Sequence, residues 1–172
     1  MEDTLAALEG GCDALAFASG MAATHCVTML LSAGDHIVAG TDIYGGTYRL
    51  FHKICNRAGI EITLVDASQP ANIAKGIQDN TKLVWIESPG NPLLSITDIK
   101  ACADIAKQAG VLIGIDNTFA SPVLTRPLEL GIDIVMHSAT KYLGGHSDAL
   151  GGALVVKDPD LREKLYFIQN AT

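Results

Sequence analysis

Apolar and polar positions divide the chain into two kinds of segment that follow one another in turn. Short apolar runs, most of them bounded by Gly, Asp, Asn or Ser, are typical of buried strands. Between them, apolar residues recur every three or four positions, which is typical of a helix with one face against a core. We predict strands at residues 13–19, 35–40, 60–66, 82–88, 111–117, 132–138 and 152–157. We predict helices within residues 20–34, 46–59, 72–79 and 97–110, and a last helix that begins at residue 161.

This alternation of strands and helices predicts the fold class. It indicates an α/β protein with three layers, α/β/α, in which helices cover both faces of a mainly parallel central sheet. We expect Thr97 to cap the helix that ends at Gly110, and Gly59 to end the helix of residues 46–59. No repeat or linker divides the chain, so residues 1–172 are expected to form a single domain.

Composition narrows the choice of partners. The chain has 172 residues, of which 48% are hydrophobic, and its 12 Lys+Arg against 19 Asp+Glu give a formal charge of -7. No basic run is present, which argues against nucleic acid and against an anionic membrane surface. No apolar stretch approaches the ~20 residues that a membrane helix requires. The expected partner is therefore a small molecule.

The cysteines indicate the compartment. No C-x-x-C pair and no signal peptide are found, and we interpret the four cysteines as reduced, buried and structural. They are Cys12, Cys26, Cys55 and Cys102. This pattern predicts a cytoplasmic protein.

Polar residues interrupt the apolar pattern at four comparable places, each at or just past the carboxyl end of a predicted strand. These are Ser19 with Gly20, residues 87–91, Asp116 with Asn117, and residues 138–141. In open α/β sheets, ligands bind at this edge. We therefore expect the four segments to converge on one crevice.

Lys141, in SATKYLGGHSD, is the candidate nucleophile. It follows two hydroxyl residues, Ser138 and Thr140, which could donate hydrogen bonds to a phosphate, and it precedes a pair of glycines. In a dry cleft, desolvation lowers the pKa of a lysine, and the neutral amine can attack a carbonyl to form a Schiff base. The alternative is a solvated surface lysine, which would leave the coincidence of hydroxyls, glycines and a strand end unexplained.

Three further features fit a phosphorylated, planar cofactor. Asp116 ends an apolar run, so its carboxylate needs a cation or strong donors, and the protonated ring nitrogen of pyridoxal phosphate (PLP) is such a cation. Ser19, Gly20 and Met21 begin a helix, whose free N–H groups and dipole favour a phosphate. Tyr44 could stack on a planar ring. Each feature has a plainer alternative: Asp116 could cap a turn, Tyr44 could be ordinary packing, and the helix start could bind nothing.

Other cofactor motifs are missing. Neither the Walker A pattern nor the G-x-G-x-x-G dinucleotide pattern occurs. The five histidines lack H-E-x-x-H spacing and a nearby cysteine pair, so no metal site is predicted. We interpret His137 as a core histidine with satisfied hydrogen bonds.

Five segments follow one another across nearly the whole chain: ASGMAA, DIYGGTYR, WIESPGNP, IDNTFASP and HSATKYLGGHSD. In this order and spacing they resemble the Cys/Met-metabolism PLP-dependent enzymes. That family includes cystathionine γ-synthase, γ-lyase and β-lyase, methionine γ-lyase and the O-acetylhomoserine sulfhydrylases. The resemblance implies PLP as cofactor and the fold of the large domain of fold type I PLP-dependent transferases.

The resemblance also implies roles for individual residues. The cofactor-binding set, with the helix-start residue Ser19 included, is Ser19, Gly20, Met21, Tyr44, Asn91, Asp116, Ser138, Thr140 and Lys141. Lys141 is expected to form the Schiff base, Asp116 to pair with the ring nitrogen, and Asn91 to donate to the phenolic oxygen of the ring. Tyr44 is expected to stack on the ring and to assist proton transfer. Tyr44 and Arg49 are the expected substrate contacts, and Lys141 and Tyr44 the catalytic residues.

The reaction that the resemblance implies is γ-elimination or γ-replacement on a homoserine-derived or cystathionine-type amino acid. Arg49 in GGTYRLF is similar to the cystathionine enzymes, whereas many sulfhydrylases carry Asn there. Gly46 in YGGT departs from the YGCT of methionine γ-lyases. We therefore favour cystathionine γ-synthase or γ-lyase, with a sulfhydrylase or methionine γ-lyase as alternatives. Gly90 stands where relatives usually carry Thr or Ser, and we expect it to loosen its loop slightly.

The resemblance covers the cofactor-binding large domain of the family. The amino-terminal arm, which hands a Tyr and an Arg to a neighbouring subunit, and the carboxyl-terminal domain are expected to lie outside these 172 residues. We expect a homo-oligomer, a dimer or tetramer, because the family forms its active sites between subunits. We expect poor turnover by this chain alone. An alternative of another class is a non-catalytic module that keeps the fold for assembly.

Overall fold

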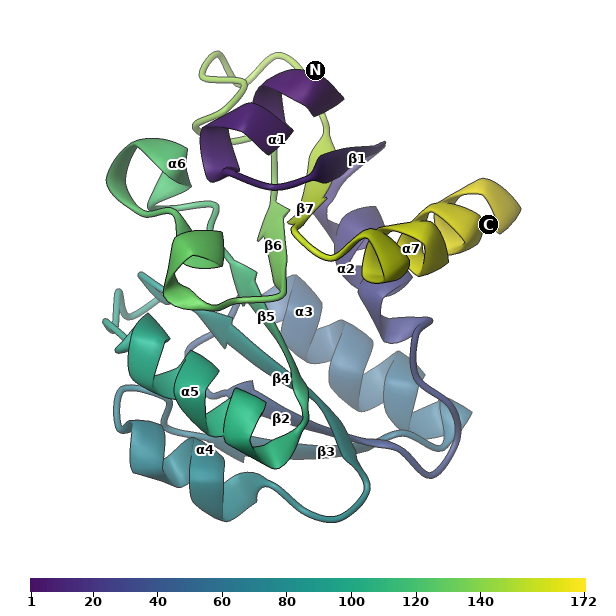
Figure 1. Ribbon diagram of the computed structural model, residues 1–172, viewed down its shortest axis with the longest axis vertical. Helices are drawn as coiled ribbons and strands as arrows, with labels where there is room; N and C mark the ends of the chain where they lie inside the picture. Colours follow the sequence, from purple (N-terminus) through teal and green to yellow (C-terminus); the bar gives the residue numbers. More distant parts are fainter.

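A computed structural model describes residues 1–172 and contains one seven-stranded sheet with helices on both sides (Figure 1). The strands are β1 Asp13–Phe17, β2 His36–Gly40, β3 Glu61–Val65, β4 Thr81–Glu87, β5 Leu112–Asp116, β6 Ile134–His137 and β7 Gly152–Val156. They lie in the order β1-β7-β6-β5-β4-β2-β3. Strand β7 runs in the opposite direction to the other six strands and pairs antiparallel with β1 and β6. The mainly parallel sheet that the sequence predicts is confirmed.

Each face of the sheet has its own set of helices. The helices α1 Glu2–Glu9, α4 Pro70–Gly76 and α5 Ile99–Ala109 pack on one face. The helices α2 Gly20–Thr28, α3 Gly45–Arg49 and α7 Pro159–Ala171 pack on the other. The α3 helix continues as a π-helical segment, Leu50–Cys55, and a 3₁₀ turn, Asn56–Ala58; a short α6, Ser121–Leu124, and a 3₁₀ turn, Pro127–Leu130, lie between β5 and β6. Figure 1 shows α5 in front of the sheet and α3 behind it, so the three-layer prediction is confirmed.

Strand β4 shows why both layers are needed. Its side chains alternate, so Val84 and Ile86 enter one hydrophobic core and Leu83 and Trp85 enter the other. The Trp85 ring is fully buried and requires a glycine beside it: a Cβ at Gly114 of β5 would lie 2.8 Å from the ring. The near-continuous apolar runs of the sequence are therefore strands buried on both faces.

The helix ends agree in part with the sequence prediction. Gly59 and Gly110 adopt left-handed conformations, with φ of 82° and 67°, and end their helices as predicted. The helix predicted for residues 20–34 ends earlier, at Thr28. The cap predicted at Thr97 is wrong by one position, because the carboxylate of Asp98 accepts the hydrogen bond from the Ala101 N–H at 3.0 Å.

Burial corrects the prediction for one cysteine. Cys26, Cys55 and Cys102 are buried thiols, as expected, but Cys12 is exposed. Cys12 lies in the turn between α1 and β1. The helix α1 was not predicted from the sequence pattern. Among the helices of the structure, none is long and apolar enough to cross a membrane.

Candidate functional site

The parallel strands bring their carboxyl ends to one edge of the sheet, where a cavity opens. Asp116, the last residue of β5, pairs in register with Glu87 of β4 and Met136 of β6. The cavity is lined by Ser19, Gly20, Met21, Tyr44, Glu87, Asn91, Asp116, Thr118, Phe119, Met136, Ser138, Thr140, Lys141 and Leu150. All nine residues predicted to bind the cofactor are in this lining, and the predicted substrate contact Arg49 is not.

The amino-terminal end of α2 forms one wall of the cavity. Ser19 caps the helix, because its Oγ accepts a hydrogen bond from the Ala22 N–H at 3.1 Å. Glycine is required next to it: a Cβ at Gly20 would lie 2.9 Å from the Cβ of Ser138. The first turn of α2 therefore lies close to the loop after β6. Its free N–H groups and the hydroxyl of Ser19 are donors that suit a phosphate group.

The loop after β6 carries Lys141 into the same cavity. The Ser138 N–H donates to the Thr118 Oγ1 at 2.8 Å, and the Lys141 N–H donates to the Ser138 carbonyl at 3.1 Å. The Thr140 hydroxyl is held by the backbone of Gly151, from which it accepts at 3.1 Å and to which it donates at 3.2 Å. These hydrogen bonds form a turn that fixes the backbone position from which the Lys141 side chain extends.

Lys141 differs from the sequence expectation in one respect. It lines the cavity but is exposed, so the dry cleft expected around it is not formed by this chain. No carboxylate forms an ion pair with its amine. Its Nζ is therefore free to meet a ligand in the cavity.

Asp116 is the buried acid of the site. Its side chain is 5% exposed and accepts a hydrogen bond from the Thr118 N–H at 3.0 Å. Burial raises the pKa of Asp116, and the bonds from Thr118 and the charge of His137 oppose that rise. No Lys or Arg forms an ion pair with Asp116. The carboxyl therefore offers an unpaired acceptor to a cationic ring nitrogen.

Glu87 is a second buried carboxyl of the site; it belongs to a segment expected at this edge of the sheet, but no role was predicted for it. Its Oε2 accepts a hydrogen bond from the Tyr44 N–H at 2.6 Å. Burial and the nearby charge of Asp116 raise the pKa of Glu87 to about 8. Glu87 is therefore mostly protonated at neutral pH. Its hydrogen bond from the Tyr44 N–H fixes the residue that precedes α3. The signal for it was the one used for Asp116, a carboxylate that ends an apolar run.

Tyr44 lies against a glycine that its position requires. A Cβ at Gly46 would lie 2.3 Å from the Tyr44 Cε1 and 2.8 Å from the Met21 Sδ. The Tyr44 side chain is 44% exposed, so one side of the ring is free for a ligand. Arg49 is exposed and lies one helical turn further along α3, outside the cavity lining.

The loop that carries Asn91 is held by Asp42. This carboxylate accepts from the N–H groups of Leu93 and Ser95, both at 3.1 Å, and from the Ser95 hydroxyl. A Cβ at Gly90 would lie 2.3 Å from the Asp42 Oδ2. The expectation that Gly90 loosens the loop is wrong, because glycine here admits the carboxylate that ties it.

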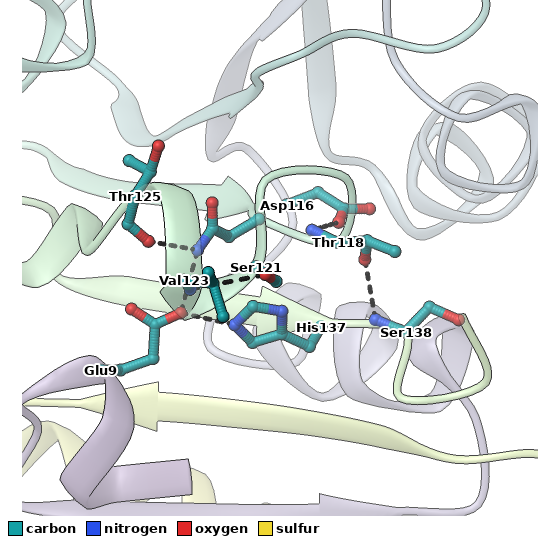
Figure 2. Close-up of polar contacts among 9 residues, drawn as sticks. Glu9, Asp116, Thr118, Ser121, Val123, Thr125, His137 and Ser138 are labelled. Atoms are coloured by element: carbon teal, nitrogen blue, oxygen red, sulfur yellow. Dashed lines mark hydrogen bonds and ion pairs between the residues drawn. The ribbon is translucent and has the colours of Figure 1, made fainter. Parts of the chain in front are cut away.

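His137 agrees only in part with its interpretation as a satisfied core residue. The ring is fully buried and its Nε2 lies 2.6 Å from the Glu9 Oε1 (Figure 2). Its Nδ1 has no hydrogen-bond partner. Glu9 belongs to α1, so nothing in the residues around His137 could have indicated this contact.

Fold and site together define a class. The sheet is mainly parallel and has helices on both sides. At one edge it carries a helix N-terminus that suits a phosphate, a buried acid without an ion-pair partner, and a lysine without one. Together these features fit an α/β protein that binds PLP. The residues present fit that cofactor: helix α2 suits the phosphate, Asp116 the ring nitrogen, Tyr44 the ring face and Lys141 the aldehyde.

The family follows from the comparison with known proteins. The model of the family described as "Cys/Met metabolism PLP-dependent enzyme" matches residues 1–172. The chain belongs to this family, whose cofactor is PLP. The resemblance stated from the five sequence segments is confirmed.

Individual relatives cover the chain fully. It is 54% identical over 172 residues to cystathionine gamma-lyase of Bacillus subtilis, which accounts for 100% of this chain and 45% of that protein. It is 52% identical to the B. subtilis cystathionine beta-lyase MetC, over 99% of this chain and 44% of that protein. The crystal structure of cystathionine gamma-lyase from Lactobacillus plantarum, complexed with L-serine, superposes with a TM-score of 0.97 at 50% identity, over 99% of this chain and 45% of that one. The chain thus spans under half the length of these relatives.

Proposed function

We propose that the protein is the cofactor-binding part of a PLP-dependent transsulfuration enzyme of the cystathionine γ-synthase or γ-lyase type. Its reaction is γ-elimination or γ-replacement on a homoserine-derived or cystathionine-type amino acid. Lys141 is the residue that forms the Schiff base. One observation carries the proposal: nine predicted residues from separate segments, Lys141 and Asp116 among them, line one cavity.

Bound PLP supplies an electron sink for charge that develops on the substrate. The residues of this chain bind and orient it. Asp116 would accept a hydrogen bond from the ring nitrogen, and the first turn of α2 with Ser19 and Ser138 would donate to the phosphate. The Lys141 amine would accept and return protons at the Cα and Cβ of the substrate. Tyr44 assists this transfer with its phenol group.

The packing around Tyr44 favours the cystathionine branch over the methionine γ-lyase branch. A side chain at position 46 has no room beside the Tyr44 ring and the Met21 sulfur. The YGCT pattern would therefore need a different tyrosine position. Product analysis with cystathionine, with cysteine plus an O-acylhomoserine, and with sulfide separates the γ-lyase, γ-synthase and sulfhydrylase reactions. With cystathionine, the same assay separates γ-cleavage from β-cleavage, the reaction named for one relative.

The Schiff-base assignment is tested on Lys141. PLP added to the protein is expected to give a yellow absorbance, and borohydride is expected to fix the cofactor on the peptide that contains Lys141. Lys141→Ala removes both signals, because no other amine lines the cavity. Lys53→Ala, which changes an exposed lysine of the π-helical segment, is the matched control and keeps both. Identical binding and absorbance in Lys141→Ala would refute the assignment.

We also propose a homo-oligomer in the cytoplasm. Loops at the carboxyl edge of the sheet expose large apolar side chains, which indicates a contact surface. These are Leu93, Leu94, Ile96, Val123, Leu124, Tyr142 and Leu150. The four cysteines are free thiols, which fits a reducing compartment. Sedimentation with and without PLP tests assembly, and the alternative of a non-catalytic module requires assembly without any uptake of the cofactor.

A further inference from the structure

A buried polar cluster lies on the face of the sheet opposite the cavity. It consists of Glu9 at the end of α1, Asn117 after β5 and His137 at the end of β6, and all three residues are 0% exposed. The Glu9 Oε1 lies 2.6 Å from the His137 Nε2 and accepts from the Asn117 Nδ2 at 2.9 Å. Figure 2 shows Glu9 reaching His137 from a helix that is distant in sequence.

The burial of these polar groups costs free energy of folding that an apolar cluster at the same place would not cost. Only one oxygen of Glu9 is bonded, and the Glu9 Oε2, Asn117 Oδ1 and His137 Nδ1 have no partner. Buried ion pairs of this kind are often no better for stability than apolar side chains of the same volume. The neighbours on α1, Leu5 and Ala6, already pack into the core on this face. The polar cluster therefore needs an explanation other than packing.

Its position in the sheet supplies one. Asp116 and Met136 pair in register and face the cavity, so the next residues, Asn117 and His137, face the other side. The Asn117 N–H also donates to the Met136 carbonyl at 2.9 Å. Glu9 thus joins the ends of the two strands from which Asp116 and the lysine loop leave the sheet.

The cluster also carries charge to the cavity. The charge of His137 lowers the pKa of Asp116 against the larger, raising effect of burial. An anionic Asp116 is the form that grips a protonated ring nitrogen. Both the geometry and the charge of the cluster therefore act on the same residue of the site.

We propose that Glu9 and His137 are positioning residues for the ring-nitrogen end of the cofactor: they join the ends of β5 and β6 and keep a positive charge behind Asp116. This inference rests on the proposed function, because it requires that Asp116 meets the ring nitrogen. It adds α1, which contributes nothing to the cavity lining, to the machinery of the site.

The test compares two ligands, PLP and its analogue with carbon in place of the ring nitrogen. Glu9→Gln keeps the shape of the side chain and removes its charge. We expect the affinity for PLP to fall about tenfold and the affinity for the analogue to change less than about twofold. His137→Gln should behave alike, and the double variant should be no worse than either single one, because the two residues act as a unit. His36→Gln, at a buried histidine on the other edge of the sheet, is the control and should affect neither ligand.

The outcomes separate the two proposals. Wild-type protein that binds neither ligand would overturn the proposed function. Normal PLP binding by Glu9→Gln, or an equal loss for PLP and the analogue, would overturn only the positioning role and leave the proposed function standing. If both variants fail to fold, the charge state of His137 in the wild-type protein decides: an imidazole found neutral at pH 7 by nitrogen NMR would overturn the proposal.

Discussion

Two buried histidines at opposite edges of the sheet show how differently one residue type can be used. His36 begins β2, and its two ring nitrogens lie 2.8 Å from the Thr81 Oγ1 and 2.9 Å from the Thr63 Oγ1. His137 ends β6, where one nitrogen meets a carboxylate and the other meets nothing. Hydroxyls donate or accept as required, so both ring nitrogens of His36 have partners, whereas Glu9 serves only one ring nitrogen of His137. Hydrogen bonding is thus complete around the histidine at the amino edge and incomplete around the one at the carboxyl edge, where the cavity opens.

The largest expected effect is the loss of cofactor affinity when Asp116, the buried acid at the carboxyl edge of the sheet, is changed. Asp116→Asn should weaken PLP binding about 100-fold, the scale of ~3 kcal/mol for removing one partner of a buried pair. The cofactor-free protein should gain stability, because a buried carboxyl without a cation is costly. Absorbance titration measures the first change and urea unfolding the second. A variant that loses both affinity and stability would contradict the division between the two edges.

Glu87 sharpens the comparison through pH. Its pKa in the folded protein is about 8, above the ordinary pKa of a glutamate. At pH values between these two pKa values, the folded state binds a proton that the unfolded state lacks. Stability of the cofactor-free protein should therefore fall as pH rises through this window, by up to about 1.4 kcal/mol per pH unit. Glu87→Gln should flatten the slope. Urea unfolding at several pH values between 6 and 8 checks it, and equal slopes in both proteins would count against a protonated Glu87.

His36 should show the opposite dependence. Burial lowers its pKa, against the raising effect of Glu61, so below neutral pH the unfolded state binds the extra proton. Stability is then lost as pH falls from about 6.5 toward the lowered value. His36→Gln should remove that loss without changing PLP affinity. Unfolding curves at pH 7.5 and pH 5.5 give the comparison, and an unchanged loss in the variant would assign it to other groups.

The smallest effect is expected where charge is exposed on both partners. Lys100 and Asp104 form an ion pair one turn apart on α5, with side chains 58% and 50% exposed. Asp104→Asn should change the free energy of unfolding by less than about 0.5 kcal/mol. Thermal unfolding at low and high salt measures it. A larger cost would mean that solvent-exposed charge matters here as much as the buried clusters do.

The sequence predicted the cavity well because its residues follow strand ends. Ser19, Asn91, Asp116 and Lys141 could be placed together once the strands were taken as parallel, since parallel strands end at one edge. Glu87 lay in one of the segments expected at this edge, but no role was predicted for it. Such predictions depend only on local pattern and direction.

Contacts made by distant segments could not be predicted in this way. Glu9 approaches His137 only because α1 packs over β1 and β7 on the face to which the His137 side chain points, and the short α1 has no clear apolar period. The exposure of Lys141 depends on what covers its loop, which no residue near it determines. The cap at Asp98 was missed by one position because threonine and aspartate can both cap a helix.

The place of β7 has a consequence for the order in which the site assembles during synthesis. Strand β1 has only one neighbour in the sheet, and that neighbour is β7, the last strand along the chain. The Ser19 carbonyl rests against Gly152, where a Cβ would lie 2.1 Å away. A growing chain on the ribosome therefore cannot complete the turn at Ser19 until β7 has emerged, although Ser19 itself lies far earlier in the sequence. The wall of the cavity at the start of α2 is therefore complete only after β7, the neighbour of β1, has been added.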